Sequence, residues 1–224
     1  MKFEHNHAHR WDVSMREAVE IQNSLASLVV EKPLPFTPRT IAGVDVSFRR
    51  RGYKDYAAQC GIAVLSLPDL EVVDKASWVG DVTFPYVPGL LSFREIPAVM
   101  RALEGLFIRP DVFMTDGQGL AHPRRFGLAC HLGVALGIPT IGVAKKKLVG
   151  EYEGLPIDRG SSTMLTHKGE PVGAAVRTRQ HVKPVFVSIG HFITLTEAVD
   201  LTLRCAPRFK IPEPTRQAHH FSRA

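Results

Sequence analysis

The order of the apolar segments is the feature that most constrains how this chain can fold. Three strand-like segments, 41–48, 57–67 and 71–80, follow one another directly, and Pro68-Asp69 marks a turn between the last two. From residue 111 onward, strand candidates alternate with helical segments. An antiparallel meander followed by strand–helix–strand units predicts an α/β fold, with one mixed central sheet flanked by helices.

Local patterns place the remaining elements. Residues 11–30 carry apolar side chains at helical spacing, and another helix is expected to end near Phe107. The last residues, 208–224, are interrupted by prolines, so we expect this tail and about the first ten residues to be loosely ordered. The second half is expected to contain strands 111–117, 140–146, 171–178 and 184–191 and helices 124–137 and 194–204.

Length and composition fit one domain spanning residues 1–224, and a monomer is expected. No apolar run reaches the roughly 18 residues that a membrane span needs, and the first residues have no apolar region typical of a signal peptide. The 3 cysteines lie far apart in apolar contexts, which favours buried thiols in a reducing cytoplasm.

Positive charge is concentrated in three short clusters, 49–51, 124–125 and 145–147, and the formal net charge is +6. Such clusters can attract phosphates without regard to base sequence. Each cluster taken alone fits a solvated turn equally well.

Two acidic residues occupy unusual places in predicted strands. Asp45 lies inside a strand whose alternation puts Gly43, Asp45 and Ser47 on one face. Asp116 ends a second apolar strand and is followed by glycine. A carboxylate in a sheet is costly unless it is hydrogen-bonded, paired or bound to metal. Either acid alone fits a cap or a turn, but together they favour a metal site.

Glu95 has two competing interpretations. Ser92 and Glu95 match the spacing of a helix capping box, in which the glutamate would only satisfy a backbone amide. Pro97 would then fall early inside the helix, where its ring conflicts with the preceding turn. The helix is therefore expected to begin nearer Pro97, which leaves Glu95 free to join Asp45 and Asp116.

Oxygen ligands without a Cys or His cage favour Mg²⁺, with Mn²⁺ as a substitute, over zinc. Acids among lysines and arginines suit a phosphodiester substrate, because the acids hold the cation and the basic groups bind phosphate. Lys145 closes a strand as Asp116 does, so both can reach one crevice. His122 lies in the loop after Asp116 and is a candidate to donate to a phosphate or to orient a water.

The segment FPYVPGLLSFRE presents an apolar tip, Tyr86-Val87, between Pro85 and Pro88. Two prolines remove two amide donors and fix two φ angles, which predicts a stiff loop. Such a tip either inserts into a partner or packs Tyr86 into the core.

The motifs GVDVSF, PYVPGLLSFRE, DGQGLAHPRR, PTIGVAKKKLVG, SIGH and PEPTRQAH occur in this order, and together they resemble endonuclease V over about residues 11–220. The resemblance implies an RNase H-like fold. It also implies an Mg²⁺-dependent enzyme that recognises inosine (deaminated adenine) in DNA, and in some members RNA. Such an enzyme cuts the second phosphodiester bond on the 3′ side of the lesion, leaving a 3′-hydroxyl and a 5′-phosphate.

The resemblance also implies roles for individual residues. Asp45, Glu95 and Asp116 would hold the metal, and His122 and Lys145 would lie near the cut phosphate. The segment Pro85-Tyr86-Val87-Pro88 would be a wedge in the duplex, and His219 matches the last motif. Backbone groups near Gly89, Leu90 and Gly117 are candidates for reading the extruded base, since glycines admit close approach. The alternatives are another nuclease on the same fold and a non-catalytic nucleic-acid binder.

Overall fold

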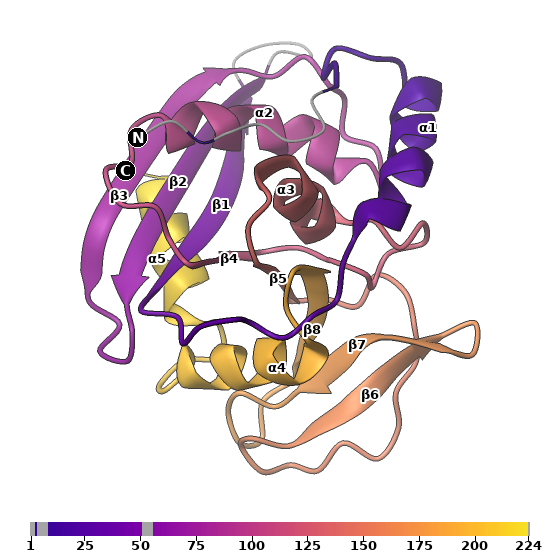
Figure 1. The fold of residues 1–224 in the computed structure, drawn as a ribbon, viewed down its shortest axis with the longest axis vertical. Helices are drawn as coiled ribbons and strands as arrows, with labels where there is room; N and C mark the ends of the chain where they lie inside the picture. The colour runs from indigo at the N-terminus through magenta and orange to yellow at the C-terminus, as the bar shows by residue number, and fades with distance from the viewer. Residues whose placement is uncertain (1–2, 4–8, 51–55, 224) are drawn as a thin grey trace.

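The computed structural model of the chain describes residue 3 and residues 9–50 and 56–223. The described strands form one eight-stranded sheet in the order β3-β2-β1-β4-β5-β8-β7-β6 (Figure 1). The first half contributes β1 (Thr40–Arg50), β2 (Tyr56–Ser66), β3 (Val72–Asp81) and β4 (Val112–Thr115). β1, β2 and β3 are the predicted antiparallel meander, and β4 runs parallel to β1.

The second half of the chain completes the sheet. β5 runs parallel to β4, and β8, β7 and β6 continue with antiparallel pairing. The predicted mixed sheet flanked by helices is therefore confirmed. The strands of this half are β5 (Thr140–Ala144), β6 (Ser162–His167), β7 (Glu170–Val176) and β8 (Val185–His191).

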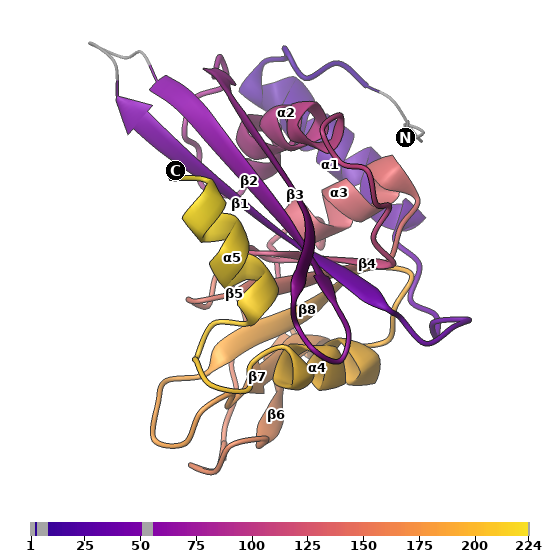
Figure 2. The same ribbon diagram turned by 90° about the vertical axis from the view of Figure 1, so that its left-hand side faces the viewer.

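Helices cover both faces of the sheet (Figure 2). On one face, α2 packs over β1, β2 and β3 and α3 over β4, β5 and β8, and both helices contribute to one apolar cluster that includes Val99, Leu103 and Leu132. On the other face, α4 and α5 pack against a second apolar cluster. Helix α1 lies beside α3, on the first face. The helices are α1 (Met15–Leu25), α2 (Leu91–Leu103), α3 (Leu128–Leu136), α4 (Leu195–Arg204) and α5 (Glu213–Phe221).

The C-terminal tail differs from the sequence expectation. Residues 213–221 form α5, which packs across β1 and β2 and buries Pro214, Thr215 and Ala218. Pro214 lies in the first turn of the helix, where a missing amide donor costs little. Near the N-terminus, most of the first ten residues lie outside the described ones, but Phe3 is buried in the core. Strand β6 was not predicted either.

The start of α2 also differs from the expectation. The helix begins at Leu91 and contains Pro97, and its N-cap residue Leu90 makes no side-chain capping bond. The Oγ of Ser92 lies 2.9 Å from Nδ1 of the buried His131 instead. Neither the capping box nor a start near Pro97 is correct, yet Glu95 is still left free of a capping role.

The unequal lengths of β1 and β4 create the place where the acids meet. β4 pairs with β1 only as far as Thr115, opposite Val44, while β1 continues to Arg50. The predicted alternation along β1 is confirmed, since Val44 and Val46 face the core under α2. Gly43 and Asp45 face α5, and Gly43 is required because an added methyl group would overlap the Pro214 carbonyl.

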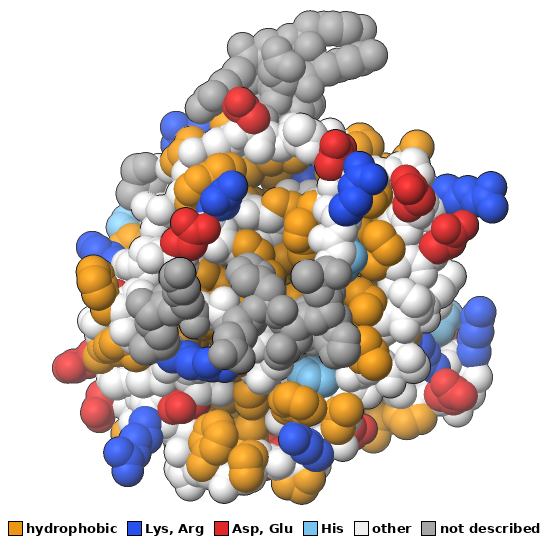
Figure 3. All heavy atoms as spheres, turned by 45° about the horizontal axis from the view of Figure 1, so that its top comes forward, with side chains coloured by type: hydrophobic (Ala, Val, Ile, Leu, Met, Phe, Trp, Pro, Cys, Tyr) orange, Lys and Arg blue, Asp and Glu red, His pale blue; other side chains and the backbone are white. Residues whose placement is uncertain are grey.

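The cysteines, the helices and the surface charge can be compared with what the composition predicted. The three cysteines are buried and unpaired. Over the described residues, no helix is long and apolar enough to cross a membrane. On the face drawn in Figure 3, lysine and arginine side chains alternate with acidic ones rather than forming one basic surface.

We predict that Gly43→Ala loosens α5. The added methyl group has no room between β1 and the backbone of α5, so the substitution should lower the free energy of unfolding by roughly 1–3 kcal/mol. Urea unfolding measures the change. Gly105→Ala is the milder comparison, since its methyl group would meet Ala76 Cβ at 3.3 Å. Equal stability of Gly43→Ala and the unmodified protein would contradict the close packing of α5.

Candidate functional site

Asp45 and Asp116 lie side by side at the end of the short strand β4. Val44 of β1 and Thr115 of β4 are the last paired residues of the two strands, and Asp45 and Asp116 follow them directly. The amide of Asp116 still donates to the carbonyl of Val44 at 3.4 Å. Neighbouring strands are about 4.8 Å apart, so the two acids emerge at nearly the same level of the sheet. Beyond this level β1 has no strand on that side, and side chains from both faces can approach.

Glu95 reaches this place from α2 and is buried, with 9% of its surface exposed. Burial raises its pKa well above the usual range, and the charges of Asp45 and Asp116 raise it further, whereas Arg94 lowers it. The charges of both aspartates therefore act on Glu95, which links the three acids that the sequence singled out from separate segments. No hydrogen bond holds the Glu95 carboxylate within the part of the chain that the structure describes.

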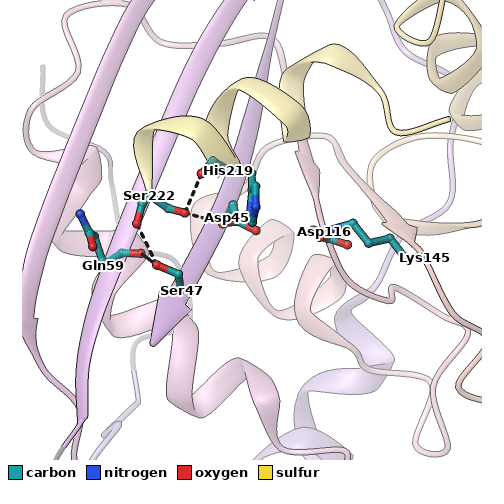
Figure 4. A network of polar contacts seen from close by, with 7 residues as sticks. All are labelled: Asp45, Ser47, Gln59, Asp116, Lys145, His219 and Ser222. Carbon is teal, nitrogen blue, oxygen red and sulfur yellow. Dashed lines mark hydrogen bonds and ion pairs between the residues drawn. The ribbon is translucent and has the colours of Figure 1, made fainter. Parts of the chain in front are cut away.

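Helix α5 supplies the partners of Asp45 (Figure 4). The hydroxyl of Ser222 donates to Oδ2 of Asp45 at 2.6 Å, and Nδ1 of His219 lies 3.1 Å from the same oxygen. Ser47 in turn donates to the Ser222 carbonyl at 2.8 Å. His219 therefore reaches the site, and Ser222 is a site residue that the sequence reasoning missed. Ser222 follows His219 by three residues, the spacing that puts two side chains on one face of a helix. The prolines before this segment argued against a helix, so the spacing was not used.

Lys145 directly follows β5 and forms an ion pair with Asp116 (Figure 4). Its side chain is 46% exposed, so the ammonium group is in contact with solvent while it touches the acid. The pair lies at the carboxyl ends of two parallel neighbouring strands, β4 and β5. The structure thus places a partly exposed ammonium group next to one of the three acids.

The donor set fits a hard divalent cation. Three carboxylates supply only oxygen ligands, which Mg²⁺ and Mn²⁺ prefer, and a cation would offset the repulsion that raises the pKa of Glu95. Asp45 and Asp116 are here engaged by protein partners instead. Among the described side chains, no three His, Cys, Asp or Glu residues are grouped so that they could hold a metal ion.

A cavity of about 370 Å³ lies beside the acids. It opens next to the first turns of α2 and α3, and Lys146 and Lys147 line its edge. A larger cavity of about 510 Å³ lies between α4 and β7, away from the acids, so size alone does not identify the site. Among the residues lining the smaller cavity are Gln22, Tyr86, Val87, Pro88, Gly89, Gly117, Gln118 and His122.

The wedge segment forms one rim of this cavity. Tyr86 is 72% exposed, and Pro85 and Pro88 are exposed as well. Val87 is half-buried and packs against Phe84 and Leu90. Tyr86 is therefore not packed into the core, and the interpretation of this segment as a core staple is wrong. Leu90 is buried under the loop and does not line the cavity.

His122 is buried and engaged on both ring nitrogens. Nε2 donates to the Gly89 carbonyl at 3.0 Å, and Nδ1 accepts from the Arg124 amide at 3.2 Å. Burial, followed by the charge of Arg124, lowers the pKa of His122 to about 4. The ring is therefore neutral at neutral pH. Neither nitrogen is left for a phosphate, so this structure does not support the role that the sequence suggested.

Comparison with known proteins gives a consistent result. The family described as Endonuclease V matches residues 23–220. Endonuclease V of Trichormus variabilis is 50% identical over 211 residues, 94% of each chain. The crystal structure of endonuclease V from Streptomyces avermitilis aligns with a TM-score of 0.89 at 44% identity, covering 95% of this chain and 93% of that one.

A third relative was solved in complex with DNA. Endonuclease V of Ciona intestinalis, in complex with a 23mer DNA containing an inosine followed by a ribo-adenosine, aligns with a TM-score of 0.80 at 28% identity. The alignment covers 94% of this chain and 97% of that one.

We predict that Glu95→Gln stabilises the metal-free protein at neutral pH. The folded pKa of Glu95 lies above its ordinary value of 4.5, so the folded state keeps a proton that the unfolded state releases. The free energy of unfolding should therefore fall as the pH rises from the pKa of Glu95 in the unfolded chain to its pKa in the folded protein. Glu95→Gln has no group that titrates in this range, so it should not show this fall in stability. Melting temperatures measured with a chelator across this pH range test it.

The exposed Glu153 provides the control. Glu153→Gln should leave the pH dependence of the melting temperature as it is in the unmodified protein. If Glu95→Gln melts with the same pH dependence as Glu153→Gln, the three acids are not coupled.

Proposed function

The chain belongs to the endonuclease V family, and we propose that it hydrolyses DNA at inosine, cutting the second phosphodiester bond on the 3′ side of the lesion. The products would carry a 3′-hydroxyl and a 5′-phosphate. One observation carries this proposal: three acids from β1, α2 and the end of β4 converge beside a cavity whose rim exposes Tyr86. A site for chemistry on a phosphate thus adjoins a site for a base.

The cavity is the proposed site of the extruded base. Hypoxanthine, the base of inosine, has O6 and an N1–H where adenine has an amino group and an unprotonated N1. A buried donor aimed at O6 would reject adenine, because the amino group would leave that donor unpaired. The amide of Leu90 is engaged with the Val87 carbonyl at 3.0 Å. The amides of Gly89 and Gly117 have no such partner among the described residues and are the proposed readers.

Tyr86 is the proposed wedge. Extruding a base costs a few kcal/mol, less where the base is mispaired, and an aromatic ring can stack in the space left behind. Pro85 and Pro88 restrict the loop before binding, which reduces the entropy lost when the ring is inserted.

The acids are the proposed cation site. Asp45, Glu95 and Asp116 would hold Mg²⁺, or Mn²⁺ in its place, and the bound ion would offset negative charge on the phosphate and activate water. Ser222 and His219 fix the orientation of the Asp45 carboxylate. Lys145 is close enough to Asp116 to place its ammonium group beside a phosphate oxygen, where it would stabilise charge in the transition state.

The most direct test is a nicking assay on a duplex with a single inosine. We expect cleavage that requires Mg²⁺, and we expect Asp45→Asn and Asp116→Asn to abolish it while both variants still bind the duplex in a gel-shift assay. Parallel substrates are inosine-containing single-stranded RNA and branched DNA, which represent the rival nuclease activities. Cleavage of branched DNA in preference to inosine DNA, or strong cutting by the Asn variants, would contradict the proposal.

We predict that Tyr86→Ala weakens discrimination more than chemistry. Losing the stacked ring should reduce the binding free energy for inosine DNA by about 1–3 kcal/mol, while the rate at saturating enzyme stays close to that of the unmodified protein. Tyr86→Phe, which keeps the ring, should bind normally. Fluorescence anisotropy and single-turnover rates separate the two effects, and unchanged affinity of the alanine variant would exclude the wedge.

A further inference from the structure

The carbonyl oxygen of Gly89 accepts three hydrogen bonds. The donors are Nε2 of Gln22 at 3.1 Å, Nε2 of His122 at 3.0 Å and Nη2 of Arg124 at 2.6 Å. A carbonyl oxygen has two lone pairs, so this oxygen is saturated. The three donors come from α1 and from the loop before α3, both remote from Gly89 in sequence.

The three donors also fix one another. Nε of Arg124 donates to Oε1 of Gln22 at 2.7 Å, which sets the orientation of the Gln22 amide. The other hydrogen of Nε2 in that amide is directed to the carbonyl of Phe126 at 3.2 Å. The amide of Arg124 donates to Nδ1 of His122, which places the ring proton on Nε2, toward Gly89. Each group is therefore held in the orientation that serves the Gly89 carbonyl.

Gly89 belongs to a turn that carries the wedge and lines the cavity. Residues 87–90 have the features of a type II turn: Pro88 at the second position, Gly89 with a φ of 79° at the third, and a bond from the Leu90 amide to the Val87 carbonyl. The peptide between Gly89 and Leu90 is thus bound at both its N–H and its C=O. At the start of the loop, the Phe84 carbonyl accepts a hydrogen bond from Arg94 of α2 at 2.5 Å.

The burial of Gln22 shows that α1 is built for this contact. In α1 only Ala18 and Gln22 are buried, and Gln22 is 1% exposed. A buried amide is costly unless all its groups are hydrogen-bonded. The side chain of Gln22 bonds to Arg124 and to the carbonyls of Gly89 and Phe126, and it lines the cavity.

A turn that could change its conformation would discriminate poorly between bases. Type I and type II turns differ by rotation of their central peptide, here the one between Pro88 and Gly89. Rotation would exchange the donor N–H of Gly89 for the acceptor carbonyl of Pro88. Glycine adopts either sign of φ easily, so the turn needs outside restraint to present only the donor.

We propose that Gln22 and Arg124 are positioning residues for base discrimination, acting through the Gly89 carbonyl. They hold the 87–90 turn in the form that offers a donor to the 6-oxo group of an extruded purine and none of the acceptors that would suit a 6-amino group. This inference rests on the proposed function, since it assigns to that cavity the part of the wall that selects the base.

The test compares Gln22→Glu and Gln22→Ala with Asn23→Ala, the exposed neighbour on the same helix. Gln22→Glu keeps the acceptor for Arg124 but loses the donor to Gly89. Affinities for matched duplexes with inosine or adenine are measured by anisotropy without divalent cation, and single-turnover cleavage is measured with Mg²⁺.

Both Gln22 variants should lower the ratio of inosine to adenine affinity by about tenfold, as expected for one lost buried hydrogen bond. The half-saturating enzyme concentration should rise, while the maximal rate stays unchanged, and Asn23→Ala should match the unmodified protein. Arg124→Lys, which keeps the charge but not the paired donors, should resemble the Gln22 variants.

The outcomes separate this inference from the proposed function. If the unmodified protein neither prefers nor cuts inosine DNA, the proposed function fails. Suppose instead that the unmodified protein prefers and cuts inosine DNA, and that melting curves show the Gln22 and Arg124 variants to be folded. If these variants then keep the full inosine preference, the inference alone is wrong. A fall in the maximal rate with unchanged preference would also overturn it, because that result would indicate a general structural defect.

Discussion

Repulsion among three carboxylates is the constraint on which the arrangement of this protein depends. Glu95 is buried beside Asp45 and Asp116, and its raised pKa reflects both burial and their charges. The remaining features of the site offset this repulsion: Lys145 pairs with Asp116, and α5 brings a hydroxyl and an imidazole to Asp45. A chain that keeps three acids together, one of them buried, at this cost to stability has a use for them that packing does not explain.

The fold explains how acids from three segments meet without a dedicated loop. Because β4 stops at Thr115 while β1 continues, the sheet has an open side at Asp45. Glu95 enters from the α2 face and Ser222 from the α5 face, so the two helical layers meet there. Gly43 lets α5 lie directly on β1, and a larger residue would move His219 and Ser222 away from Asp45.

Sequence predicted the parts of this arrangement that local patterns determine. Alternation along β1 gave the face of Asp45, and two prolines around Tyr86 gave an exposed, stiff tip. It failed where tertiary contacts override local preference: prolines near α5 suggested a loose tail, but burial against β1 and β2 makes a helix of it. The bonding of His122 and Gln22 could not be predicted, because both serve a carbonyl that is distant in sequence.

The cavity and the acids meet on one loop, at the consecutive residues Asp116 and Gly117, which bears on how the proposed enzyme would cut at a fixed distance from a lesion. Asp116 and Gly117 are consecutive residues, and their Cα atoms are about 3.8 Å apart; the first belongs to the acid cluster and the second lines the cavity. Gly142 of β5 leaves no room for a methyl group beneath this loop, so the loop is packed tightly onto the sheet. Under the proposed function, a base at Gly117 and a phosphate at Asp116 would be separated by a distance that this tightly packed loop sets. The number of nucleotides between lesion and cut would then follow from that distance and from the path of the strand.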